Sequence, residues 1–147
     1  MTYLPDVNVL VALVWPQHIH HKAAHTWFAG EPRDGWATCA LTQTGLVRVS
    51  SNPRIIRDAR TPVESHALLG RIVSHPGHSY WDRSVDLSAH EDIPAELLQG
   101  HTQVTDVYLL LLATFHDGVL ATFDRRLERA AAGTRLADHI RRIPVDD

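Results

Sequence analysis

Apolar residues are densest between His101 and Asp124, and this stretch predicts a buried helix followed by a buried strand. The segment from Val107 to Phe115 is nearly all apolar, which is too rich for a surface helix and too short to cross a bilayer. A turn at Asp117-Gly118 then leads into the apolar residues 119–123, which predict a strand lying alongside the helix.

Two carboxylates mark the ends of these predicted elements. Asp106 falls in the first turn of the helix, and Asp124 follows the last residue of the strand. If the helix and strand are antiparallel neighbours, both acids face one space at the edge where open α/β sheets bind ligands. We expect Thr102 or Thr105 to cap the start of the helix, and Gly118 to close its end.

Short apolar strands and helices alternate along the rest of the chain. The pattern predicts strands at residues 3–5, 36–40, 79–81, 119–123 and 139–145, the last of them an edge strand. It predicts helices at residues 8–15, 18–30, 41–50, 62–75 and 125–130. This alternation indicates an α/β fold whose central, mainly parallel sheet has about five short strands flanked by helices.

The bulk composition is that of an ordinary globular protein. With 147 residues, 44% hydrophobic and 21% charged, the chain is expected to form a single domain over residues 1–147. Asp6 interrupts the N-terminus before a signal sequence could form, and no apolar run approaches membrane-spanning length. Cys39 is the only cysteine, so no intramolecular disulfide forms and a reducing cytoplasm is the expected location, with no membrane association.

The charge distribution leaves nucleic-acid binding open. A net charge of −3 argues against binding by bulk electrostatics but allows a local basic patch. Arg48, Arg54, Arg57 and Arg60 form such a cluster in the sequence. Both phosphate contact and a solvated arginine face are compatible with this pattern.

Two histidines have the spacing of metal ligands. His21 and His25 are four residues apart on a predicted amphipathic helix, a spacing that zinc sites use. No third ligand at a recognisable spacing accompanies them, so a solvated polar face is the favoured interpretation, with a transition-metal site as the alternative.

A third carboxylate makes the predicted sheet edge a candidate metal site. Asp6 follows the first strand, so Asp6, Asp106 and Asp124 are all expected at one edge. Gathered carboxylates repel one another unless a cation neutralises them, and an all-oxygen ligand set selects Mg²⁺ or Mn²⁺. A metal-activated water is a nucleophile suited to a phosphodiester. Asn8 and Thr122 are candidates for the outer shell.

Each acid also has a simpler explanation. Asp6 and Asp124 could cap the helices that follow them, and Asp106 could interact with a helix dipole. Taken singly, each acid fits a capping or helix-dipole role better than a role as a metal ligand. Taken together, three acids at three such junctions favour a metal site.

Four segments together resemble one protein family. PDVNVLVAL, ATCALTQTGLVRVSSNP, TDVYLLLLA and DGVLATFD occur in an order and at intervals that resemble PIN-domain ribonucleases, most of all the VapC toxins of bacterial toxin–antitoxin pairs. The resemblance extends from Tyr3 to about Arg142. It implies an endoribonuclease, dependent on Mg²⁺ or Mn²⁺, that cleaves structured RNA such as tRNA or rRNA. It also implies a homodimer silenced by a cognate VapB antitoxin whose tail occupies the cleft.

The family's site residues carry over with one exception. Asp6, Asp106 and Asp124 match the first, third and fourth acids, and Asn8 and Thr122 also fit the pattern.

The exception is Gln43, which stands where the family usually has a glutamate. A glutamine can coordinate through its carbonyl oxygen but brings no negative charge, which implies weaker metal affinity. Arg48, one turn further on, is the candidate contact for RNA or antitoxin. Gln43 also supports an alternative, a PIN-like module that binds RNA or antitoxin without turnover. A phosphatase with Asp6 as the phosphorylated nucleophile is disfavoured, because the only lysine, Lys22, falls on the polar helix.

Overall fold

A five-stranded parallel sheet organises the computed structural model, which describes residues 1–32, 34–89 and 93–145. Its strands are β1 (Tyr3–Pro5), β2 (Trp36–Thr38), β3 (His78–Tyr80), β4 (Val119–Thr122) and β5 (Ile140–Arg142). They lie in the order β3-β2-β1-β4-β5, and each neighbouring pair is parallel. The predicted α/β fold with about five short strands and an edge strand at the C-terminus is confirmed.

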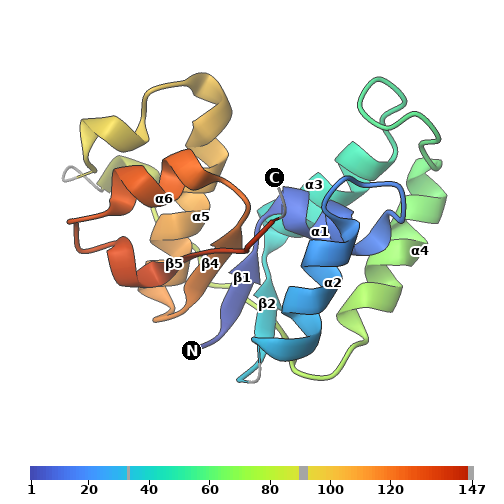
Figure 1. Ribbon diagram of the computed structural model, residues 1–147, viewed down its shortest axis with the longest axis horizontal. Helices are drawn as coiled ribbons and strands as arrows, with labels where there is room; N and C mark the ends of the chain where they lie inside the picture. The colour runs from blue at the N-terminus through green and yellow to red at the C-terminus, as the bar shows by residue number, and fades with distance from the viewer. Residues whose placement is uncertain (33, 90–92, 146–147) are drawn as a thin grey trace.

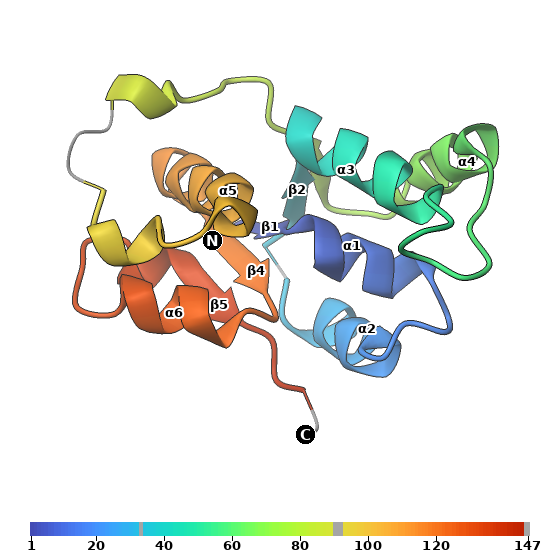
Figure 2. The ribbon, with the colours of Figure 1, turned by 90° about the horizontal axis from the view of Figure 1, so that it is seen from above.

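Helices cover both faces of this sheet. They are α1 (Val7–Val14), α2 (His21–Gly30), α3 (Ala40–Ser50), α4 (Pro62–Val73), α5 (Val104–Phe115) and α6 (Arg125–Ala131). Figures 1 and 2 show α5 and α6 on one side of the strands and α1 to α4 on the other. None of the helices in the described ranges is long and apolar enough to span a membrane.

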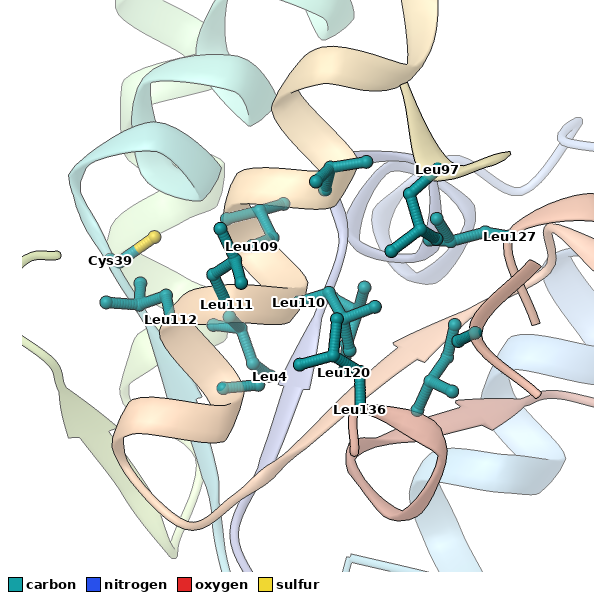
Figure 3. Packing of buried hydrophobic residues seen from close by; sticks show 14 of the residues in the cluster. Leu4, Cys39, Leu97, Leu109, Leu110, Leu111, Leu112, Leu120, Leu127 and Leu136 are labelled. Carbon is teal, nitrogen blue, oxygen red and sulfur yellow. The ribbon is translucent and has the colours of Figure 1, made fainter. Parts of the chain in front are cut away.

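Alternation along the strands separates two hydrophobic cores. On β4, Leu120 packs with α5 and α6, whereas the next residue, Ala121, packs with α1 to α4. On β2, Ala37 belongs to the first of these cores and Trp36 to the second. The first core is built around the leucines of α5, as Figure 3 shows. Residues 109–112 of that helix are all buried, so its apolar sequence reflects burial on all sides rather than on a single stripe.

The ends of α5 differ from the sequence prediction. The helix begins at Val104, after a 3-10 turn, and its N-cap Gln103 makes no side-chain cap bond, so neither predicted threonine cap forms. At the other end Asp117, not Gly118, adopts the left-handed conformation, with φ 53°. Gly118 is required for a close approach instead, because a Cβ there would lie 2.6 Å from the carbonyl oxygen of Thr2.

Five other elements are shorter than predicted, among them β5, which spans Ile140–Arg142 rather than 139–145, and two of them, α2 and β2, are shorter for local reasons. Helix α2 starts at His21 rather than His18, because the His18 ring accepts a hydrogen bond from the backbone N–H of His20 and holds a turn. Strand β2 ends at Thr38, because Cys39 already caps α3.

Candidate active site

The three predicted acids lie at the sheet edge formed by the carboxyl ends of the neighbouring strands β1 and β4. Pro5 of β1 pairs with Ala121 of β4, so these parallel strands end side by side. Asp6 follows β1 directly, and Asp124 lies two residues beyond the end of β4. Asp106 reaches the same edge from the first turn of α5, the helix that runs antiparallel to β4 beside it.

Asp6 is held rigidly in the protein interior. The residue is 5% exposed, and both of its carboxylate oxygens accept hydrogen bonds. Oδ1 accepts from the backbone N–H of Val9 at 2.9 Å, and Oδ2 accepts from the hydroxyl of Thr122 at 2.7 Å. Asp6 therefore caps α1, as its simpler explanation predicted, while its second oxygen is tied to β4.

Asp124 combines capping with a link to the same hydroxyl. Its Oδ1 accepts from the backbone N–H groups of Arg126 and Leu127, at 2.9 and 3.2 Å, and so caps α6. Its own backbone N–H donates to Thr122 Oγ1 at 3.0 Å. The Thr122 hydroxyl thus bridges two of the three acids, which agrees with its predicted place next to the acids.

Burial and the charges of neighbouring acids both raise the pKa values of Asp6 and Asp106. Burial raises the pKa of Asp6 to about 7, and the negative charges of Asp106 and Asp124 add to this rise, against the lowering effect of the bonds from Thr122 and Val9. Burial likewise raises the pKa of Asp106 to about 6, with the charge of Asp124 contributing. Negatively charged side chains are therefore gathered at a place where burial already disfavours the charged form of each carboxyl group.

The donor set suits a hydrated, hard cation. Within the described residues no three His, Cys, Asp or Glu side chains converge closely enough to enclose an ion. Mg²⁺ rarely uses such a cage; it keeps several waters and binds through one or two carboxylates. Asp106 is half-buried and shows no hydrogen-bond partner among the described residues, so its oxygens remain open to an ion or a water.

Gln43 has a partner outside the acid cluster. Its Nε2 donates to Thr38 Oγ1 at 3.0 Å, and that hydroxyl lies 2.8 Å from Nε2 of His78. The amide is thus drawn toward β2 and β3. The chain of bonds through Thr38 and His78 was not foreseen, because it joins residues 40 positions apart.

The arginine cluster is divided between two environments. Arg48 is exposed and lines a hollow of about 510 Å³ between α3 and α4, together with Gln43 and His66. Arg60 instead lies over the ring of Trp15 at 5.6 Å and contacts Glu64 at 4.0 Å. Arg54 and Arg57 are exposed as well, so Arg48 stays the predicted ligand contact because of its place beside Gln43 in this hollow.

The two histidines of α2 bind the backbone of α1. His21 Nδ1 lies 2.7 Å from the carbonyl oxygen of Ala12, and His25 Nε2 lies 2.8 Å from that of Leu13. His25 is exposed and His21 half-buried, as the predicted solvated face requires in part, but both rings also bind backbone. The rings satisfy carbonyls at the end of α1 that have no partner within that helix. No sequence pattern signals this role, which depends on how α2 packs on α1.

Comparison with known proteins gives one consistent result. The family model for the PIN domain matches residues 3–133. Among curated relatives from Mycobacterium tuberculosis, Ribonuclease VapC39 is 42% identical over 134 residues, covering 90% of this chain and 96% of the relative. Ribonuclease VapC44 is 39% identical over 143 residues, covering 95% and 98%. Ribonuclease VapC38 is 42% identical over 121 residues, covering 82% and 84%.

Proposed function

This chain belongs to the PIN-domain family, and from that premise we propose that it is a metal-dependent endoribonuclease, the toxin of a type II toxin–antitoxin pair. The observation that carries the proposal is that Asp6, Asp106 and Asp124 come from three separate elements to one sheet edge, at the ends of the paired strands β1 and β4 and the start of α5. The ribonuclease names of its relatives support the same reaction class.

The hydrogen bonds and burial of each acid suggest a different role for it in the site. Asp6, with both oxygens already bonded, would serve as a fixed charge in the floor of the site. Asp106 and the second oxygen of Asp124 would supply the open ligand positions. Mg²⁺ or Mn²⁺ bound here would neutralise the carboxylates and stabilise negative charge that develops on the phosphoryl oxygens. Thr122 would hold Asp6 and Asp124 in a fixed position relative to each other.

Substrate and partners are part of the proposal. The expected substrate is structured RNA such as tRNA or rRNA, cleaved in the cytoplasm, with Arg48, which lines the hollow between α3 and α4, as a contact for RNA or antitoxin. We also propose that the chain forms a homodimer and that a VapB-type antitoxin, encoded beside it, blocks the site. The VapC names of the relatives support these assignments.

Cleavage of RNA by purified protein tests the function directly. Total RNA is incubated with the wild-type protein and with Asp106→Asn, each with Mg²⁺, with Mn²⁺ or with EDTA. Cleavage by the wild type that EDTA blocks, and that Asp106→Asn lacks, is the expected result. Mapping the new 5′ ends would then identify the RNA and the cleaved bond.

The same experiment decides the alternative raised by Gln43. A protein that retains RNA or antitoxin in a binding assay, yet cleaves no RNA with either metal, would be a binding module. Cleavage that survives both EDTA and Asp106→Asn would contradict a metal-dependent mechanism at these acids.

A further inference from the structure

His18 approaches the catalytic edge through one specific contact. Its Nε2 lies 3.0 Å from Oδ1 of Asn8, in the first turn of α1 and two residues after Asp6. The other ring nitrogen, Nδ1, accepts a hydrogen bond from the backbone N–H of His20 at 2.9 Å. Because Nδ1 accepts, it carries no proton, so in the neutral ring the proton is on Nε2.

This tautomer dictates which way the Asn8 amide faces. A protonated Nε2 can only donate, and an Asn8 amide turned the other way would set its own N–H groups against that donor. Oδ1 therefore faces His18, and the donor group Nδ2 is left without a partner among the described residues. The amide presents N–H groups on the exposed first turn of α1, two residues after Asp6, where an oxygen acceptor of a bound substrate could receive them.

Packing keeps the His18 ring in this position. Its centroid lies 6.4 Å from that of Phe123 in a stacked arrangement, and His20 lies 4.8 Å from the same ring. Phe123 is the residue between Thr122 and Asp124, so His18 rests on the segment that carries the last acid. Burial also lowers the pKa of His18, with the nearby His20 and His21 adding to the effect, and this favours the neutral ring.

We propose that His18 is a positioning residue for RNA cleavage: by fixing the Asn8 amide it directs the Nδ2 donor toward a non-bridging oxygen of the bound phosphodiester. The proposal rests on the proposed ribonuclease function and adds a residue from the turn between α1 and α2 to it. His18 itself contacts neither RNA nor metal in this arrangement. Its whole effect on the reaction should therefore pass through Asn8.

A double-mutant cycle tests that dependence. His18→Ala is expected to lower kcat/KM by about three- to ten-fold, the value of one oriented hydrogen bond. The same substitution made in an Asn8→Ala background should cost less than about two-fold, because the group it orients is absent. His18→Gln, whose amide can still donate to Asn8 Oδ1, should recover most of the activity. His75→Ala, which removes an exposed histidine two residues beyond the end of α4, is the matched control.

Two results would overturn the inference while leaving the nuclease itself intact. One is a loss from His18→Ala that is equally large with and without Asn8. The other is failure of His18→Gln to recover activity although its melting temperature matches that of the wild type. Inactive wild-type protein would instead contradict the proposed function, and with it this inference.

The ring tautomer gives a readout independent of activity. Nitrogen-15 NMR of the wild-type protein at pH 8 should show His18 as the neutral ring with the proton on Nε2. A proton on Nδ1 would contradict the arrangement, because that nitrogen could not then accept from His20. The Asn8→Ala variant should keep this tautomer, since the bond from His20 is unchanged.

Discussion

Thr122 donates a hydrogen bond of 2.7 Å to Asp6, across 116 residues of sequence, and the same hydroxyl accepts the backbone N–H of Asp124. One side chain on β4 therefore fixes the acid that follows β1 and the acid that follows β4. Since Asp6 is buried and its pKa is raised, this bond stabilises its charged form where the surroundings oppose it.

Removing the Thr122 hydroxyl should weaken both metal binding and turnover. Thr122→Val keeps the shape but deletes the donor to Asp6 and the acceptor for Asp124. We expect the Mg²⁺ concentration for half-maximal cleavage to rise by about ten-fold or more, as for other groups that orient metal ligands. Thr122→Ser retains the hydroxyl and is the control. A valine variant with an unchanged Mg²⁺ dependence would show that the hydroxyl has no such role.

Stability in the absence of metal should depend on pH through the acids. An unfolded aspartate titrates near pH 3.8, whereas the pKa of Asp106 in the fold is about 6. Between these values the folded protein binds more protons than the unfolded chain, so this group's contribution to stability is lost as pH rises. Asp106→Asn should therefore be more stable than the wild type by about 1–2 kcal/mol at pH 8, discounted for partial exposure.

Urea unfolding in EDTA at pH 8 and at pH 4 measures this effect. The advantage of Asp106→Asn should nearly vanish at pH 4, where the wild-type carboxyl is protonated in the fold. Because the two proteins differ at one residue, contributions from titrating groups that do not interact with Asp106 cancel. Asp6 does not cancel, because the charge of Asp106 raises its pKa, and its response to the substitution adds to the difference in the same direction. An equal difference at both pH values would mean that charge repulsion is not its source.

Divalent cations should offset the loss of folding stability that repulsion between the carboxylates causes. Mn²⁺ at about 100 times its Kd would stabilise the wild-type fold by about 2.7 kcal/mol. Asp106→Asn, which lacks an open ligand, should gain much less at the same concentration. Thermal unfolding with increasing Mn²⁺ measures the difference, and Arg71→Ala, on an exposed part of α4, is the control. Equal stabilisation of wild type and Asp106→Asn would place the ion elsewhere.

A glutamate at position 43 should restore the charge that this chain lacks. We expect Gln43→Glu to lower the Mg²⁺ concentration for half-maximal cleavage, because a fourth carboxylate near the site increases its attraction for a cation. The new side chain can still accept from the Thr38 hydroxyl, although the donor that Gln43 supplies is lost. Gln43→Ala separates these two effects. An unchanged Mg²⁺ titration for Gln43→Glu would show that the site does not need the charge.

The histidines of α2 should matter for stability rather than for metal binding. His21→Ala removes the bond to the Ala12 carbonyl and should cost about 1 kcal/mol, which lowers the melting temperature by about 3 °C. His66→Ala, exposed on α4, should change it little. Micromolar Zn²⁺ should stabilise neither protein. A zinc-dependent rise that is lost in His21→Ala would favour the metal site instead.

The acids of the site could be predicted because their positions follow from local rules. Apolar runs of strand length end just before Asp6 and Asp124, and Asp106 opens a helix whose composition shows that it is buried. Parallel strands bring their carboxyl ends to one edge, so all three acids could be assigned to it. The same rules predicted the class of fold and the five strands.

Helix ends and side-chain partners were decided by tertiary structure. Whether Thr102 caps α5 depends on the 3-10 turn before it, and the need for glycine at position 118 comes from the approach of Thr2. The alternatives for His21 and His25 could be separated only once α2 was seen to pack on the end of α1.

By itself, then, the sequence determined the α/β class, the order of its elements and the gathering of Asp6, Asp106 and Asp124, because hydrophobic periodicity and strand direction are encoded locally. Only the tertiary structure decided which hydroxyl orients Asp6, where the Gln43 amide is held and that His18 reaches Asn8. Those contacts depend on strand pairing and helix packing, which bring together residues whose spacing in the chain carries no signal of their contact.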